Sequence, residues 1–156
     1  VRDLSHLLRP SALDDLGLSA ALRALASDVA DRSRITVDLD IQIGGATFTP
    51  EIEVVVYRVV QEALTNIAKH APDATSVSVV LDRSDTTLQL TIEDDGHGFD
   101  AGAVRDAARK KGAGLGHAGM RERLALIGGE LEIESSVGLG TTVYARVPLQ
   151  HERLMA

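Results

Sequence analysis

The stretch from 35 to 43 alternates apolar and polar residues without a break, and it constrains the fold more than any other part of the chain. Its apolar members are Ile35, Val37, Leu39, Ile41 and Ile43. Because side chains on a strand point alternately to its two faces, this period predicts a strand that is buried on one side only. The Gly44-Gly45 pair that follows is typical of the end of a strand.

Two further pairs of alternating runs predict β-hairpins. The first joins 77–81 to 88–92 across a polar turn, and the second joins 131–133 to 143–147 around Gly138-Leu139-Gly140. Together with the first strand these runs make about five strands, most of them antiparallel.

Three segments have the spacing of helices. Residues 18–29 carry one apolar stripe, 50–71 combine an apolar back with a polar front, and 120–127 end at a glycine pair. Pro50 suits the first turn of a helix, and the length of its segment outweighs the strand preference of the valines that follow. The sequence therefore predicts an α+β fold, a two-layer α/β sandwich in which about three helices cover one face of a mixed five-stranded sheet.

Composition restricts the class of protein. The 156 residues suit one domain, and the formal charge of −7 argues against a general nucleic-acid binder, so any polyanion bound here should be small and locally caged. The chain has no cysteine, which excludes disulfides and thiolate metal sites and suits a reducing cytosol. No apolar run approaches the length of a membrane span.

The two ends of the chain differ from its middle. Residues 1–16 carry leucines around Arg9-Pro10, and we expect the end of an upstream helix followed by a linker. We expect residues 17–149 to make the folded domain and 150–156 to make a disordered tail. Since the chain begins at Val1 without a signal-peptide pattern, we expect it to be part of a longer protein.

The first candidate site is the polar face of the helix at 50–71. Glu62, Asn66, Lys69 and His70 share this face by the helical period. Amide and carboxylate oxygens suit Mg²⁺, and the two basic side chains suit phosphate charge. The alternative is an ordinary solvated helix face.

The second candidate is the loop that follows the run at 88–92, with the sequence Asp94-Asp95-Gly96-His97-Gly98. Its carboxylates can select hydrogen-bond donors, and its glycines allow backbone to approach a ligand closely. The acidic spacing of a calcium loop is absent. A simple turn at the end of a strand remains the alternative.

The third candidate is the glycine-rich stretch 112–119, which runs into the last helix. A glycine-rich turn at a helix N-terminus offers unpaired N–H groups and a positive dipole end to phosphate. Its glycines also match the dinucleotide-binding pattern, with Glu134 near the position of the ribose acid. That reading is less favoured, because basic residues 109–111 stand where the pattern requires a strand. A flexible connector is the other alternative.

In this order the three candidate sites resemble the ATP-binding catalytic domain of sensor histidine kinases, which shares the Bergerat ATP-binding fold with gyrase-type ATPases. The segment 61–71 resembles the N box, 94–98 the G1 box and 112–119 the G2 box, while 138–141 resembles the glycine-threonine turn before the final strand. The resemblance covers nearly the whole chain.

Two flanking segments are similar to the nitrate-sensor-like subfamily, whose lid between the G1 and G2 boxes is short. They are 8–18 and the Gly-Met-Arg-Glu-Arg run at 119–123. The lid here would be 100–111. The resemblance also makes 1–16 the end of a dimerisation helix and its linker.

For the adenine end of the site, the resemblance assigns roles to four residues. Asp94 would bind the adenine amino group, and Gly96 and Gly98 would let backbone lie beside the ring. Thr141 would line the same end of the pocket.

For the phosphate end, the resemblance assigns Asn66 to Mg²⁺, with Glu62 assisting through a water on the metal or as a polar organiser. These two are the expected catalytic and metal-binding residues. Lys69 and His70 would reach toward the phosphates of ATP. Backbone donors to the phosphates would come from Gly114, Leu115 and Gly116.

The resemblance implies a protein-histidine kinase whose acceptor lies elsewhere, because no phosphoacceptor histidine motif occurs in this chain and His6 lacks the required acidic neighbour. The expected cofactors are ATP and Mg²⁺. The expected partners are the dimerisation domain of a homodimeric cytoplasmic parent, with or without a membrane anchor, and a response regulator. No nucleic acid or direct membrane contact is expected, and the chain alone should not autophosphorylate.

Other functions stay open on the sequence alone. A related ATPase or serine kinase would share the fold, and a non-catalytic module would sense nucleotide through lid movement. A dinucleotide-dependent oxidoreductase is the remote alternative.

Overall fold

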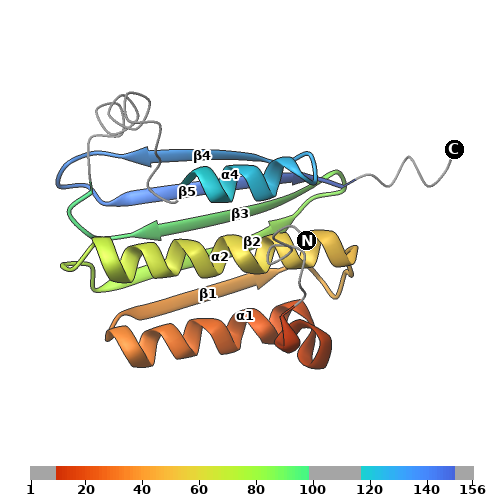
Figure 1. Ribbon diagram of the computed structural model, residues 1–156, viewed down its shortest axis with the longest axis horizontal. Coiled ribbons are helices and arrows are strands. Elements are labelled where there is room, and N and C mark those ends of the chain that lie inside the picture. The colour runs from red at the N-terminus through yellow and green to blue at the C-terminus, as the bar shows by residue number, and fades with distance from the viewer. Residues whose placement is uncertain (1–9, 99–116, 150–156) are drawn as a thin grey trace, which may run out of the picture.

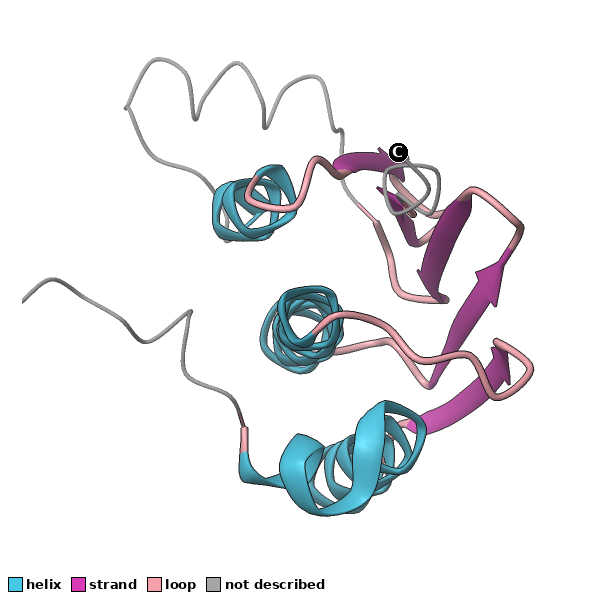
Figure 2. Cartoon of the chain, turned by 90° about the vertical axis from the view of Figure 1, so that its right-hand side faces the viewer, coloured by secondary structure: helices cyan, strands magenta, loops and turns pink. Residues whose placement is uncertain are grey.

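The computed structural model describes residues 10–98 and 117–149, which form two layers (Figure 1). Its helices are α1 (Ser11–Ser33), α2 (Pro50–His70) and α4 (His117–Ala125). Its strands are β1 (Thr36–Gln42), β2 (Ser76–Arg83), β3 (Thr87–Asp94), β4 (Glu130–Ser135) and β5 (Thr141–Pro148). α1, α2 and α4 all lie on one face of the sheet (Figure 2). The predicted α+β sandwich is confirmed.

The sheet has five strands in the order β1-β2-β3-β5-β4. β1 runs parallel to β2, while the other neighbouring strands are antiparallel. A parallel pair needs a crossover connection, and α2 supplies it between β1 and β2. This crossover holds α2 over the middle of the sheet, next to the end of β3.

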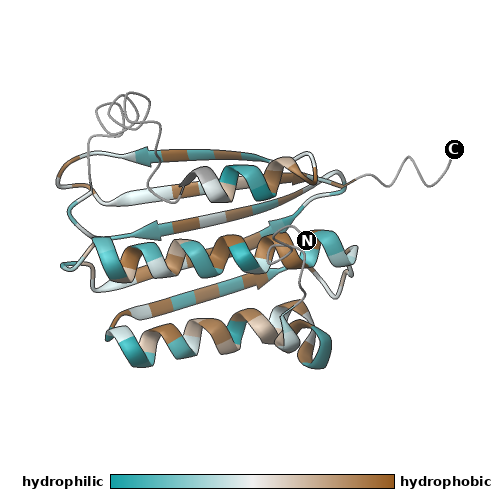
Figure 3. Cartoon of the chain, viewed as in Figure 1, coloured by the Kyte–Doolittle hydropathy of each residue, from teal (hydrophilic) through white to brown (hydrophobic). Residues whose placement is uncertain are grey.

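Apolar and polar residues alternate along the strands, as the hydropathy colouring shows (Figure 3). In β3 the inward positions Leu88, Leu90 and Ile92 are at most 3% exposed, and Asp94 is the next inward position. Each fully buried aliphatic side chain contributes about 1.5–3 kcal/mol of transfer free energy, so the apolar pattern fixes which way β3 faces. That orientation directs Asp94 toward the helix layer.

α2 begins and ends where the sequence predicts. Thr49 caps it by accepting a hydrogen bond from the backbone N–H of Ile52 at 3.2 Å, and Pro50 occupies the first turn. Its valines are buried: Val59 is fully buried and Val60 is 1% exposed. Burial against the sheet therefore outweighs the strand preference of these β-branched residues.

α1 starts earlier than the apolar stripe predicts. Residues 11–16 are helical as well, and the helix bends at Gly17, whose φ of 84° and ψ of 170° are not helical. Leu13 is 2% exposed and belongs to the core, so burial of this leucine holds the first turn in place. The division of the chain at residues 16 and 17 stays a prediction.

Several expectations lie outside the described residues. They concern the upstream helix end within 1–9, the lid at 100–111 and the tail at 150–156. Within 10–98 and 117–149, no helix is long and apolar enough to cross a membrane.

Candidate functional site

The polar face of α2 holds the first group of predicted site residues. Glu62 and Asn66 are partly buried, whereas Lys69 and His70 near the end of the helix are exposed. The buried opposite face, which includes Ala63, fixes the orientation of the helix about its axis. The predicted separation of an apolar back from a polar front is therefore present.

Asn66 carries an unsatisfied polar atom. Its Nδ2 is buried and has no hydrogen-bond partner in the described part of the chain. Buried amides are nearly always paired, so this unsatisfied donor marks Asn66 as a position where a polar partner is expected. Among residues 10–98 and 117–149, no group of three or more His, Cys, Asp and Glu side chains could hold a metal by itself. An amide that binds a metal together with substrate phosphates fits this arrangement.

Asp94 is the buried acid of the site and is only 7% exposed. Its Oδ1 accepts a hydrogen bond from the backbone N–H of Gly96 at 2.8 Å, which fixes the carboxylate at the end of β3. Burial raises the pKa of Asp94 above its ordinary value, the hydrogen bond from Gly96 opposes that rise, and the neighbouring Asp95 adds to it. A buried carboxylate of this kind is an acceptor ready for a ligand donor.

Asp95 points elsewhere and anchors the loop. Its carboxylate accepts hydrogen bonds from the backbone N–H and the hydroxyl of Thr75, at 2.8 and 2.7 Å, and from the backbone N–H of Ser76 at 3.1 Å. The hydroxyl of Thr75 contributes most to lowering the pKa of Asp95. The two adjacent acids therefore have different roles: Asp94 faces the helix layer and Asp95 ties down the loop.

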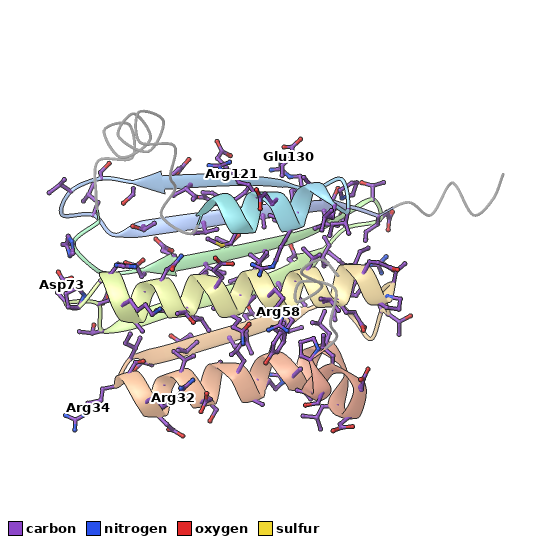
Figure 4. The ribbon with its side chains drawn as sticks, viewed as in Figure 1. Arg32, Arg34, Arg58, Asp73, Arg121 and Glu130 are labelled. Atoms are coloured by element: carbon purple, nitrogen blue, oxygen red, sulfur yellow. The ribbon has the colours of Figure 1, made fainter. Side chains whose placement is uncertain are left out.

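His97 makes a second tie between the loop and the segment after α2. Its backbone N–H donates to Oδ1 of Asp73 at 3.3 Å, and its Nδ1 lies 2.8 Å from the same oxygen. Asp73 lies just beyond the end of α2 (Figure 4). The hydrogen bond with His97 lowers the pKa of Asp73. His97 itself is exposed.

Glycines are required where the loop meets the turn between β4 and β5. A Cβ on Gly98 would lie 2.2 Å from the carbonyl oxygen of Ser136, and a Cβ on Gly140 would lie 2.3 Å from the carbonyl oxygen of Asp94. The backbone N–H of Gly138 donates to the carbonyl oxygen of His97 at 2.5 Å. Gly96 packs on the end of α2, since its Cβ would lie 3.0 Å from that of Ala71.

Thr141 lies beside Asp94, as its pairing partner in the ladder between β3 and β5. Its hydroxyl is 2.7 Å from that of Ser135. The structure thus brings Thr141 and Asp94 together with Gly96, Gly98 and the end of α2. Gly114, Leu115 and Gly116 lie outside the described residues.

Glu62 is held by a residue that the sequence patterns did not identify. Its Oε1 forms an ion pair with Nη1 of Arg123 on α4. Asp73 and Thr75 were also missed as loop anchors, because they stand in a short turn whose pattern carries no ligand signal. The only sequence signal for Arg123 is its four-residue spacing from Gly119, which places both residues on one face of α4.

Comparison with known proteins gives consistent matches. A sequence profile of the family described as "Histidine kinase-, DNA gyrase B-, and HSP90-like ATPase" matches residues 51–151. The oxygen sensor histidine kinase NreB of Staphylococcus carnosus is 42% identical over 149 residues, which cover 96% of this chain and 41% of NreB. The sensor histidine kinase MctS of Rhizobium johnstonii is 40% identical over 153 residues, which cover 98% of this chain and 32% of MctS. The chain therefore spans less than half the length of these relatives.

Solved structures agree in fold. The histidine kinase domain of the blue-light activated histidine kinase from Erythrobacter litoralis matches with a TM-score of 0.65 and 28% identity, over 88% of this chain and 64% of that chain. The mycobacterial sensor histidine kinase MprB matches with a TM-score of 0.61 and 22% identity, over 83% of this chain and 93% of that chain, and supports the fold alone.

Proposed function

This chain belongs to the histidine kinase-, DNA gyrase B- and HSP90-like ATPase family and is an ATP-binding catalytic domain of the histidine kinase type. On that premise we propose that it binds Mg-ATP and transfers the γ-phosphoryl group to a histidine on a dimerisation domain outside this sequence. From that histidine the group passes to an aspartate of a response regulator.

The observation that carries the proposal is the buried carboxylate of Asp94 at the inward end of β3. The backbone N–H of Gly96 orients it, and both Asp95 and His97 tie its loop to the segment between α2 and β2. A fixed acceptor selects an amino group on a flat heterocycle, with Gly96 and Gly98 supplying close backbone approach. Thr141 lines the same end of the site.

The phosphate end of the proposed site would be formed by α2 and by the glycine-rich segment 112–116 before α4. Asn66 and Glu62 would hold Mg²⁺, which neutralises charge on the phosphates when bound. Lys69 and His70 near the end of α2 would reach toward the phosphates, and backbone N–H groups of 114–116 would complete the phosphate site. Phosphoryl transfer depends mainly on positioning and charge stabilisation, so this chain needs no nucleophile of its own.

The partners and the compartment follow from the same proposal. The relatives are named as sensor histidine kinases and are much longer than this chain. We therefore place the chain in a homodimeric, cytoplasmic parent kinase that supplies the dimerisation domain and works with a response regulator.

Calorimetric titration with a non-hydrolysable ATP analogue tests the adenine assignment. Asp94→Asn should weaken binding about 10- to 100-fold, because a hydrogen bond to a charged acceptor contributes about 1.5–3 kcal/mol. Glu93→Gln is the matched control, since Glu93 is the adjacent acid and is exposed on the opposite face of β3. Unchanged affinity in Asp94→Asn would show that Asp94 does not bind the adenine amino group.

A further inference from the structure

The ion pair between Glu62 and Arg123 joins two helices that the proposed site needs together. It links residues 61 positions apart, and the side chains of Arg123 and Glu62 are 26% and 27% exposed. Nε of Arg123 is buried and has no hydrogen-bond partner within the described residues. The pair is thus partly withdrawn from water, where solvent screening of its attraction is reduced.

Gly119 makes space for this pair on the same face of α4. A Cβ at this position would lie 3.2 Å from Oε2 of Glu62 and 3.8 Å from Nη1 of Arg123. Residues one helical turn apart are neighbours on a helix surface, so Gly119 and Arg123 together present a gap and a cation to α2. Oε1 of Glu62 pairs with Arg123, and Oε2 lies against the space left by Gly119.

The ion pair is not what attaches α4 to the domain. Met120 is fully buried and Leu124 is 1% exposed, and both belong to the hydrophobic core. Partly buried ion pairs contribute little net stability, because removing their charges from water offsets their attraction. The pair therefore has its main effect on the position of the Glu62 carboxylate.

We propose that Arg123 is a positioning residue for the phosphoryl-transfer site: together with Gly119, it fixes the carboxylate of Glu62 one helical turn before Asn66. This inference rests on the proposed function and extends it. An unpaired glutamate samples several rotamers, whereas a paired one holds a single geometry toward the metal and its waters. The pair also makes the position of Glu62 depend on α4, the helix that follows the glycine-rich segment proposed to bind the phosphates.

The test measures two quantities on the whole chain. The first is the gain in affinity for an ATP analogue on adding Mg²⁺, by calorimetry. The second is the rate of phosphoryl transfer to a separately made dimerisation domain at saturating Mg-ATP. Arg123→Met should reduce both about 10-fold, as expected for loss of a group that orients a metal-site ligand, while affinity without Mg²⁺ stays unchanged. Arg123→Lys should restore part of the loss because it keeps the charge.

Gly119→Ala perturbs the same carboxylate without removing a charge. It should lower the Mg²⁺-dependent gain in the same direction as Arg123→Met but by less, because a methyl group displaces Oε2 by only a few tenths of an ångström. Arg121→Met is the matched control on α4. Arg121 donates to the carbonyl oxygen of Leu131 at 2.7 Å and does not pair with Glu62, so both quantities should be unchanged.

Separate outcomes contradict the inference and its premise. If Arg123→Met and Gly119→Ala keep the wild-type Mg²⁺-dependent gain and transfer rate, Arg123 does not position Glu62 and the inference fails while the proposed function stands. If Glu62→Gln has no effect on either quantity, Glu62 has no role for Arg123 to support. Failure of the unaltered chain to bind the ATP analogue contradicts the proposed function and the inference together.

Discussion

Burial of the Asp94 carboxylate lowers the stability of the folded chain. It is 7% exposed, and burial raises its pKa above the ordinary value of 3.8. The folded state therefore binds this proton more tightly than the unfolded state does, and the contribution of Asp94 to stability grows as pH falls through the raised pKa toward 3.8. The pKa values of Asp73 and Asp95 are lowered instead, so the stability that these acids contribute is lost only below 3.8.

Asp94→Asn should make the nucleotide-free chain more stable near neutral pH, by about 1 kcal/mol, because the amide has no charge to desolvate and can still accept from Gly96. It should also remove the contribution that Asp94 makes to stability as pH falls toward 3.8. Urea denaturation over a series of pH values measures both effects. A variant less stable than the unaltered chain at neutral pH would mean that the charge of Asp94 is stabilised by contacts within the protein.

Among the structural elements, the site depends on close contacts between backbone segments at the end of β3. The loop 94–98 contacts the segment after α2 on one side and the turn between β4 and β5 on the other. Gly138 and Gly140 in that turn both have positive φ, of 86° and 78°. A Cβ on Gly140 would meet the backbone of Asp94, whereas a Cβ on Gly138 would meet nothing within 4 Å, although the backbone N–H of Gly138 donates to His97 in the loop.

Alanine at these two positions separates backbone strain from steric contact. Gly138→Ala should cost about 1–2 kcal/mol of unfolding free energy, the penalty for a left-handed backbone. Gly140→Ala should cost clearly more and should also weaken binding of an ATP analogue, because its methyl group would displace the backbone of Asp94. Urea denaturation and calorimetry measure these effects. Equal losses in the two variants would mean that the contact between turn and loop has no steric importance.

Local patterns predicted the elements well and their contacts only in part. The two-residue period of β1 and β3 and the amphipathic pattern of α2 depend on residues that are close in sequence. The strands, the helix and its polar face with Glu62 and Asn66 could therefore be recognised. The parallel pairing of β1 with β2 depends on the fold of the whole chain, and no local pattern encodes it. The same holds for the pair between Glu62 and Arg123, which joins residues 61 positions apart.

At the scale of the molecule, the α2 crossover between β1 and β2 explains why distant motifs meet. It sets the polar face of one helix beside the loop that ends β3, and the turn before β5 closes the same loop from the other side. A site built in this way can bind nucleotide with groups drawn from the helix, the strand end and the turn. In the proposed function, the histidine that receives the phosphoryl group comes from another domain.

Transfer of a labelled phosphoryl group to a dimerisation domain tests the proposed function directly. The chain is incubated with Mg²⁺, ATP labelled in the γ-phosphate and a separately made dimerisation domain from the same parent kinase. We expect acid-labile label on a histidine of the dimerisation domain, no label on this chain alone, and a large loss of transfer in Asp94→Asn. Steady hydrolysis of ATP with no labelled histidine would contradict it and would favour a related ATPase.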